Sequence, residues 1–133
     1  MYTSVRDGLI RLFEAETDVL AAYLFGSHSR GSPTFESDLD IAVLLRETPQ
    51  KLLDHFLHLL NKLSEVLGDK VDLVILNTAP PLLKYQIIRW GRPIYSRDER
   101  ARTLFEARTT SEYLDFSRAI KRYDECLMKH ILT

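Results

Sequence analysis

The sequence predicts an α/β (α+β) fold in which a small mixed sheet of three to four strands is flanked by helices. Three apolar runs of strand length occupy residues 19–25, 38–45 and 70–76 and are bounded by turn residues. Segments before and after these runs repeat apolar residues with a helical period. Residues 98–131 contain neither Gly nor Pro, which predicts a long C-terminal helical segment. The length of 133 residues predicts a single domain, 1–133.

The first half of the chain begins with an amphipathic helix over residues 4–16, for which Ser4 is a candidate N-cap. The strand over residues 19–25 follows. Residues 32–37 are rich in turn formers and predict a loop before the strand that runs from Asp38 to about Leu45.

In the second half, Thr48-Pro49 predicts the start of a helix, and Gly68 predicts its end. The strand over residues 70–76 comes next. A helix over residues 80–89 and a short strand at 93–96 complete a core of about residues 19–96.

The apolar residues of 98–131 fit one or two long helices. Their stripe is broader than is needed to cover one face of a small sheet. A helix of a partner protein could cover the excess, and packing on the chain's own core would explain it equally well.

Composition places the chain among ordinary globular proteins. Its single cysteine, Cys126, excludes an internal disulfide and fits a reducing compartment, and the N-terminus has no apolar signal segment. No apolar run approaches the roughly 20 residues of a membrane span, so we expect a cytoplasmic protein without a membrane partner.

Charge is unevenly divided between the two halves of the chain. Residues 1–72 hold seven Lys or Arg against twelve Asp or Glu, whereas residues 73–133 hold eleven against seven. An acidic half is expected where a metal site is built. The basic half could meet a triphosphate or an acidic partner, or its residues could simply form solvated helix faces. A net charge of −1 does not support direct nucleic-acid binding.

The candidate functional residues surround one turn. Gly26-Ser27 ends the first strand run, and Asp38 and Asp40 open the next run after a ten-residue spacer. If the alternating apolar residues of that run face the core, both aspartates share the opposite face. Carboxylates spaced this way can converge on a pair of divalent cations, and a Gly-Ser turn offers backbone amides and a hydroxyl to phosphate.

Each half of this pattern is common alone, but their combination resembles the polymerase-beta-type nucleotidyltransferase superfamily. The closest likeness is to minimal nucleotidyltransferase (MNT) antitoxins that are paired with HEPN toxins. The pattern of that family is Gly-Ser, often Arg-Gly, then Asp-x-Asp and a later third carboxylate. This sequence has Gly26-Ser27, Arg30-Gly31, Asp38-x-Asp40 and, as the candidate third carboxylate, Asp72 in the strand at 70–76.

The resemblance implies a role for each of these residues. Asp38, Asp40 and Asp72 would be catalytic residues and the ligands of two Mg²⁺ ions, and Asp72 would also help to remove the proton of the attacking hydroxyl. Gly26 and Ser27 would hold the phosphates of ATP, and Arg30 would neutralise charge on the leaving group. The catalytic core would be about residues 19–96, with 98–131 as an added helical segment.

The resemblance also implies a protein adenylyltransferase that neutralises a HEPN-type ribonuclease toxin, encoded by a neighbouring gene, by adding AMP to a hydroxyl, most simply that of a tyrosine. Two alternatives stay open: transfer to a small molecule such as an aminoglycoside, and a binding antitoxin without catalysis. The expected lack of a separate acceptor-binding domain disfavours the first. The presence of all three carboxylates and of Gly-Ser disfavours the second.

Overall fold

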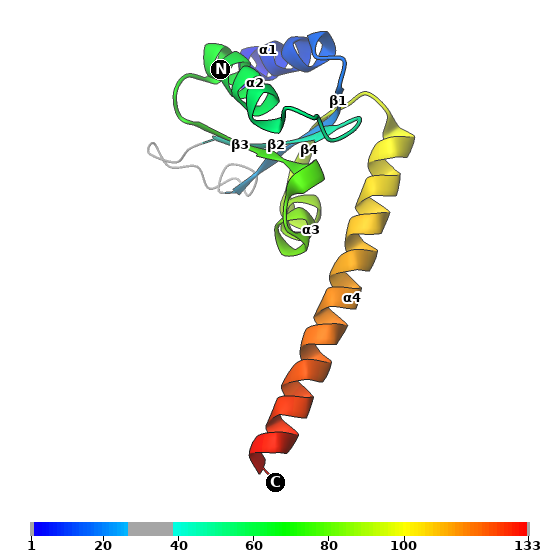
Figure 1. Ribbon diagram of the computed structural model, residues 1–133. Coiled ribbons are helices and arrows are strands. Elements are labelled where there is room, and N and C mark those ends of the chain that lie inside the picture. The colour runs from blue at the N-terminus through cyan, green and yellow to red at the C-terminus, as the bar shows by residue number, and fades with distance from the viewer. Residues whose placement is uncertain (1, 27–38, 133) are drawn as a thin grey trace.

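A computed structural model describes residues 2–26 and 39–132 as a mixed sheet flanked by helices (Figure 1). One short 3₁₀ turn, Leu76–Thr78, follows the third strand. The other elements, in chain order, are α1 (Tyr2–Ala15), β1 (Val19–Phe25), β2 (Leu39–Leu45), α2 (Leu52–Leu67), β3 (Val71–Ile75), α3 (Pro81–Trp90), β4 (Arg92–Ser96) and α4 (Glu99–Leu132). The predicted fold class is therefore confirmed.

The sheet has the strand order β3-β2-β1-β4. β1 pairs antiparallel with both β2 and β4, whereas β2 and β3 run parallel. A parallel pair needs a crossover, and α2 supplies it. The crossover puts the first residues of β2 and β3 at the same edge of the sheet as the last residues of β1.

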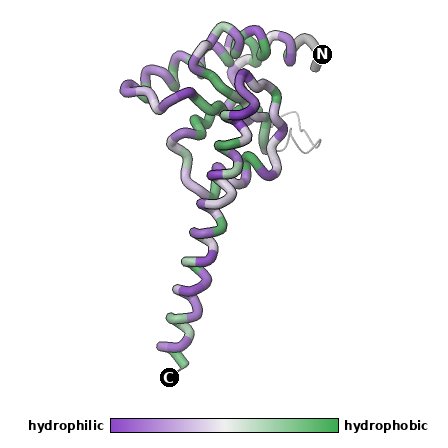
Figure 2. Tube along the Cα trace, turned by 90° about the vertical axis from the view of Figure 1, so that its right-hand side faces the viewer, coloured by the Kyte–Doolittle hydropathy of each residue, from purple (hydrophilic) through white to green (hydrophobic). Residues whose placement is uncertain are grey.

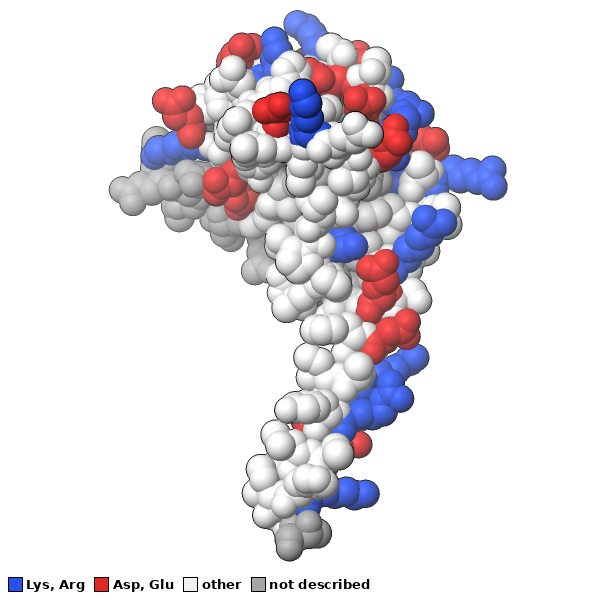
Figure 3. Space-filling view, viewed as in Figure 1, with Lys and Arg blue, Asp and Glu red and all other residues white. Residues whose placement is uncertain are grey.

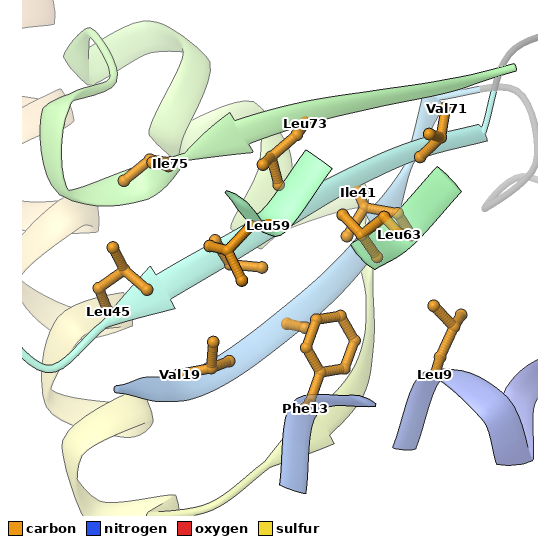
Figure 4. Packing of buried hydrophobic residues seen from close by; sticks show 12 residues of the cluster. Leu9, Phe13, Val19, Ile41, Leu45, Leu59, Leu63, Val71, Leu73 and Ile75 are labelled. Carbon is orange, nitrogen blue, oxygen red and sulfur yellow. The ribbon is translucent and has the colours of Figure 1, made fainter. Parts of the chain in front are cut away.

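Helices cover both faces of the sheet (Figure 1). On one face, α1 and α2 bury the larger hydrophobic cluster, to which Phe13 and Leu59 contribute fully buried side chains (Figure 4). On the other face, α3 and the start of α4 cover a smaller cluster that includes Tyr23 and Ile87. Figure 2 shows the hydrophobic residues gathered in the sheet and its covering helices, while hydrophilic residues predominate along α4.

Two helix starts differ from the sequence prediction. α1 begins at Tyr2, so Ser4 lies inside the helix and is not its N-cap. α2 begins at Leu52, after Lys51, and not at Thr48-Pro49. Leu52 is the first residue of this segment to pack against the core, whereas Thr48 is exposed. Tertiary packing, and not the local cap signal, sets where α2 begins.

The C-terminal segment is one helix of 34 residues and not two. Its first turns pack on the sheet and on α3, and its second half extends away from the domain (Figure 1). Every residue from Leu114 to Leu132 is exposed. Across residues 2–26 and 39–132, no helix combines the length and the hydropathy needed to cross a membrane.

A partly buried hydrogen bond fixes the start of α4 to the centre of the sheet. The Tyr23 hydroxyl donates to Oε1 of Glu106 at 2.9 Å, and Arg102 Nη1 lies 3.1 Å from the same oxygen. Arg102 also contacts Glu99 at 2.6 Å. Burial, followed by the hydrogen bond to Glu106, raises the pKa of the Tyr23 hydroxyl well above its usual value. This phenol therefore stays protonated in the folded protein.

We expect Tyr23→Phe to lower the free energy of unfolding by about 1 kcal/mol at pH 8, because one partly buried hydrogen bond is lost while Arg102 still pairs with Glu106. The pKa of Tyr23 is higher in the folded chain than its ordinary value near 10. The stability from this group is thus complete below about pH 10 and is lost as the pH rises through the folded-state pKa. Urea denaturation at pH 8 and pH 10.5 measures both effects. A difference between wild type and variant that grows with pH would contradict this account.

Candidate active site

Two of the predicted carboxylates lie side by side in the sheet. Asp40 and Asp72 are register partners in the parallel pairing of β2 with β3. Adjacent strands are about 4.8 Å apart, and register partners point to the same face, so the two carboxylates leave the sheet as neighbours. Asp72 is exposed and opposes the buried Val71 and Leu73, as the alternation of the sequence predicts. Both aspartates therefore lie on the face covered by α3.

Gly26 brings the backbone at the end of β1 against Asp40. Phe25, the last residue of β1, is the register partner of Asp40, and Gly26 follows with a φ of +78°. A Cβ atom at Gly26 would collide with carboxylate oxygen Oδ2 of Asp40. Only glycine both adopts this φ without strain and leaves room for the carboxylate. The turn that was predicted to approach phosphate thus lies directly beside one of the two acidic residues.

The other predicted site residues, Ser27, Arg30 and Asp38, lie outside the described residues. Asp40 and Asp72 supply the hard oxygen donors that Mg²⁺ prefers. Within residues 2–26 and 39–132, no three His, Cys, Asp or Glu side chains gather into a metal-binding group. The donors present suit a shared divalent cation, and the metal-binding role of all three aspartates stays a prediction.

A pocket beside Gly26, at the end of β1, was not predicted from the sequence. Its volume is about 240 Å³, and α3 forms one side of it. It is lined by Phe25, Gly26, Leu83, Gln86, Ile87 and Trp90. The Trp90 side chain is 58% exposed, and the Arg89 guanidinium lies 5.0 Å from the Trp90 ring centroid. The sequence signal that could have indicated this pocket is the single Trp of the chain, which directly follows the helix predicted over residues 80–89.

Comparison with known proteins relates most of the chain to one family. The family model described as polymerase beta, nucleotidyltransferase matches residues 7–100. The protein adenylyltransferase MntA of Shewanella oneidensis is 38% identical over 93 residues, which cover 68% of this chain and 63% of that protein. The match therefore spans less than two thirds of the length of that relative.

Two solved structures share the fold over nearly the whole chain. One is a crystal structure of a toxin-antitoxin with AMP-PNP, with a TM-score of 0.77 and 29% identity over 92% of this chain and 98% of that one. The other is a tri-AMPylated Shewanella oneidensis HEPN toxin in complex with MNT antitoxin, with a TM-score of 0.74 and 27% identity over 96% of this chain and 99% of that one.

Gly26→Ala and Gly68→Ala form a matched pair of substitutions that tests the contact between Gly26 and Asp40. Gly26 and Gly68 both have positive φ, but a Cβ at Gly68 meets no atom within 4 Å. Each change to Ala should cost about 1 kcal/mol of unfolding free energy through backbone strain. Only Gly26→Ala should also displace the Asp40 carboxylate, and so remove the rise in melting temperature caused by Mg²⁺ together with nucleotide. Thermal melts of both variants with and without these ligands test this. Equal responses to the ligands would show that the contact with Asp40 has no bearing on the site.

Proposed function

Because the chain belongs to the polymerase beta nucleotidyltransferase family, we propose that it is a protein adenylyltransferase that moves AMP from ATP to a hydroxyl of a partner protein. One observation carries the proposal: Asp40 and Asp72 are neighbours on one sheet face, with the Gly26 backbone against Asp40. Two acidic side chains beside a glycine turn are suited to holding a metal-bound triphosphate.

The proposed partner is a HEPN-type toxin encoded by a neighbouring gene, and the proposed acceptor is a tyrosine hydroxyl. Support comes from the MNT antitoxin complexed with an AMPylated HEPN toxin, whose structure this chain resembles over almost its full length. Adding AMP to the toxin would introduce bulk and negative charge, which oppose RNA binding. The free, exposed Cys126 fits a cytoplasmic site of action.

In the proposed reaction the tyrosine oxygen attacks the α-phosphorus of ATP. A new phosphorus–oxygen bond forms, the bond between the α-phosphorus and its bridging oxygen breaks, and pyrophosphate leaves. Asp72 accepts the phenolic proton, directly or through water. Ser27 and the backbone at Gly26 hold the terminal phosphates, and Arg30 offsets charge on the departing pyrophosphate.

We propose Mg²⁺ as the metal, held by Asp38, Asp40 and Asp72. Two bound Mg²⁺ ions would offset the charge of the triphosphate and lower the pKa of the attacking hydroxyl. The protein contributes the placement of the acidic groups. Asp40 and Asp72 are fixed by strand pairing, so little reorganisation is needed when a metal-bound nucleotide enters.

The pocket formed by α3 is suited to the base of the nucleotide. It adjoins Gly26 on the same sheet face as the two aspartates, and most of its lining is apolar. The indole of Trp90 offers a surface for stacking, and the side-chain amide of Gln86 offers both a donor and an acceptor. A volume of about 240 Å³ accommodates a purine ring system.

Intact-mass spectrometry of the toxin tests the proposed activity. The purified toxin is incubated with ATP, Mg²⁺ and either wild type or the Asp38→Asn/Asp40→Asn variant. With wild type the toxin should gain about 329 Da for each AMP added and lose its ribonuclease activity, whereas the variant should add no mass because its metal ligands are weakened. Equal inhibition by both proteins without a gain of mass would establish neutralisation by contact alone.

Trp90→Ala should weaken ATP binding about 10-fold, because stacking of a base on an aromatic side chain contributes roughly 1–3 kcal/mol. Isothermal titration with a non-hydrolysable ATP analogue and Mg²⁺ measures the affinity. Leu104→Ala is a suitable control, since Leu104 is a similarly exposed apolar residue on α4 and does not line the pocket. Affinity for inorganic triphosphate should be unchanged in Trp90→Ala. Equal weakening for triphosphate and for the ATP analogue would place Trp90 outside the base site.

A further inference from the structure

The side of α4 that packs on α3 continues beyond α3 into turns whose residues are all exposed. Tyr113 stacks on Tyr85 of α3, with ring centroids 3.9 Å apart and ring planes 7° apart, and Thr109, one turn earlier, is buried. The following turns carry large apolar side chains on the same side of the helix. We call these five residues the distal seam: Phe116, Ile120, Tyr123, Leu127 and Ile131. Each is between 46% and 67% exposed.

Basic side chains of this half of α4 avoid the distal seam. Its four Lys and Arg residues all lie about 100° or more around the helix from Ile120. They are Arg118, Lys121, Arg122 and Lys129. Figure 3 shows most charged side chains of the lower part of α4 along one edge, while the opposite edge is mostly uncharged. Two acidic residues border the seam: Glu112, which pairs with Lys84 of α3 at 3.3 Å, and Asp124. A complementary surface would therefore be apolar with Lys or Arg at its border.

The distal seam lies on the same side of the sheet as the candidate active site. α4 descends from the sheet on the side of α3, which is also the side on which Asp40 and Asp72 lie (Figure 1). Because the seam continues the surface that contacts α3, it faces into the angle between α4 and the domain. A protein seated along the seam would lie next to α3, on the same side of the sheet as the two carboxylates.

We propose that the distal seam is the docking surface for the acceptor protein of the proposed function, on which this inference rests. The docked element is an amphipathic helix that places apolar residues on the seam and Lys or Arg near Asp124. Docking along the seam holds the acceptor hydroxyl close to the α-phosphorus, where proximity contributes most to the reaction.

A second copy of this chain fits the seam less well. Antiparallel symmetric pairing about the middle of the seam would bring Asp124 of the two copies together. No Lys or Arg among residues 111–132 lies on the seam side to offset this pair of carboxylates. The charge pattern therefore favours a basic partner helix over self-association.

Two leucines provide a matched test of the docking surface. Leu127 lies in the seam and is 46% exposed, whereas Leu114 lies on the other side of α4 and is 44% exposed. Neither residue lines the pocket or contributes to the active site. We expect Leu127→Ser to raise the Kd for the toxin about 10- to 100-fold, as expected for the loss of one buried leucine, and Leu114→Ser to leave it within about 2-fold. Ile120→Ser gives a second seam variant.

Kinetics of AMP transfer separate docking from chemistry. The seam variants should raise the KM for the toxin by a similar factor and keep kcat, and their affinity for the ATP analogue with Mg²⁺ should stay that of wild type. Circular dichroism confirms that α4 remains helical in each variant.

Unchanged toxin affinity in Leu127→Ser and Ile120→Ser would overturn the docking surface, even if AMP is transferred and the proposed function stands. Seam-dependent binding without any transfer by wild type would instead overturn the proposed function and support the docking surface. Sedimentation of wild type alone as a dimer that Leu127→Ser dissociates would assign the seam to a second copy and overturn the proposal.

Discussion

The parallel register between β2 and β3 is the constraint on which the candidate site depends. It makes Asp40 and Asp72 neighbours although 31 residues of sequence separate them. A slip of one residue would turn Asp72 toward the cluster buried by α2 and leave Asp40 without its neighbour. The apolar residues that alternate with Asp72 oppose such a slip, because they would lose their buried positions. The hydrophobic core thus determines the geometry of the acidic site.

Much of this arrangement could be predicted from local patterns. Alternation in β2 and β3 correctly indicated the faces of Asp40 and Asp72, and the Gly-Ser and Asp-x-Asp spacing correctly identified the family. These signals are contained in short windows, where period and spacing determine side-chain direction. The roles of Ser27, Arg30 and Asp38 stay predictions, since those residues lie outside the described part of the chain.

Contacts between distant segments could not be predicted in this way. The hydrogen bond from Tyr23 to Glu106 joins residues 83 positions apart, and no local pattern marks it. The start of α2 at Leu52 depends on which residue first reaches the core, and the pocket beside Gly26 depends on how α3 packs on β1. In each case tertiary packing decides among conformations that the local sequence allows equally.

The unsupported half of α4 has a consequence for the lifetime of the protein. Beyond Tyr113 every described residue of the helix is exposed, so its order there depends mainly on its own hydrogen bonds and on side-chain pairs along its surface. An isolated helix of about 20 residues is only marginally stable in water. The free energy needed to open it therefore falls toward the C-terminus, which makes this half a favoured site for proteolytic cleavage. A partner that covers the seam would protect it, so that the chain would survive longest in the complex.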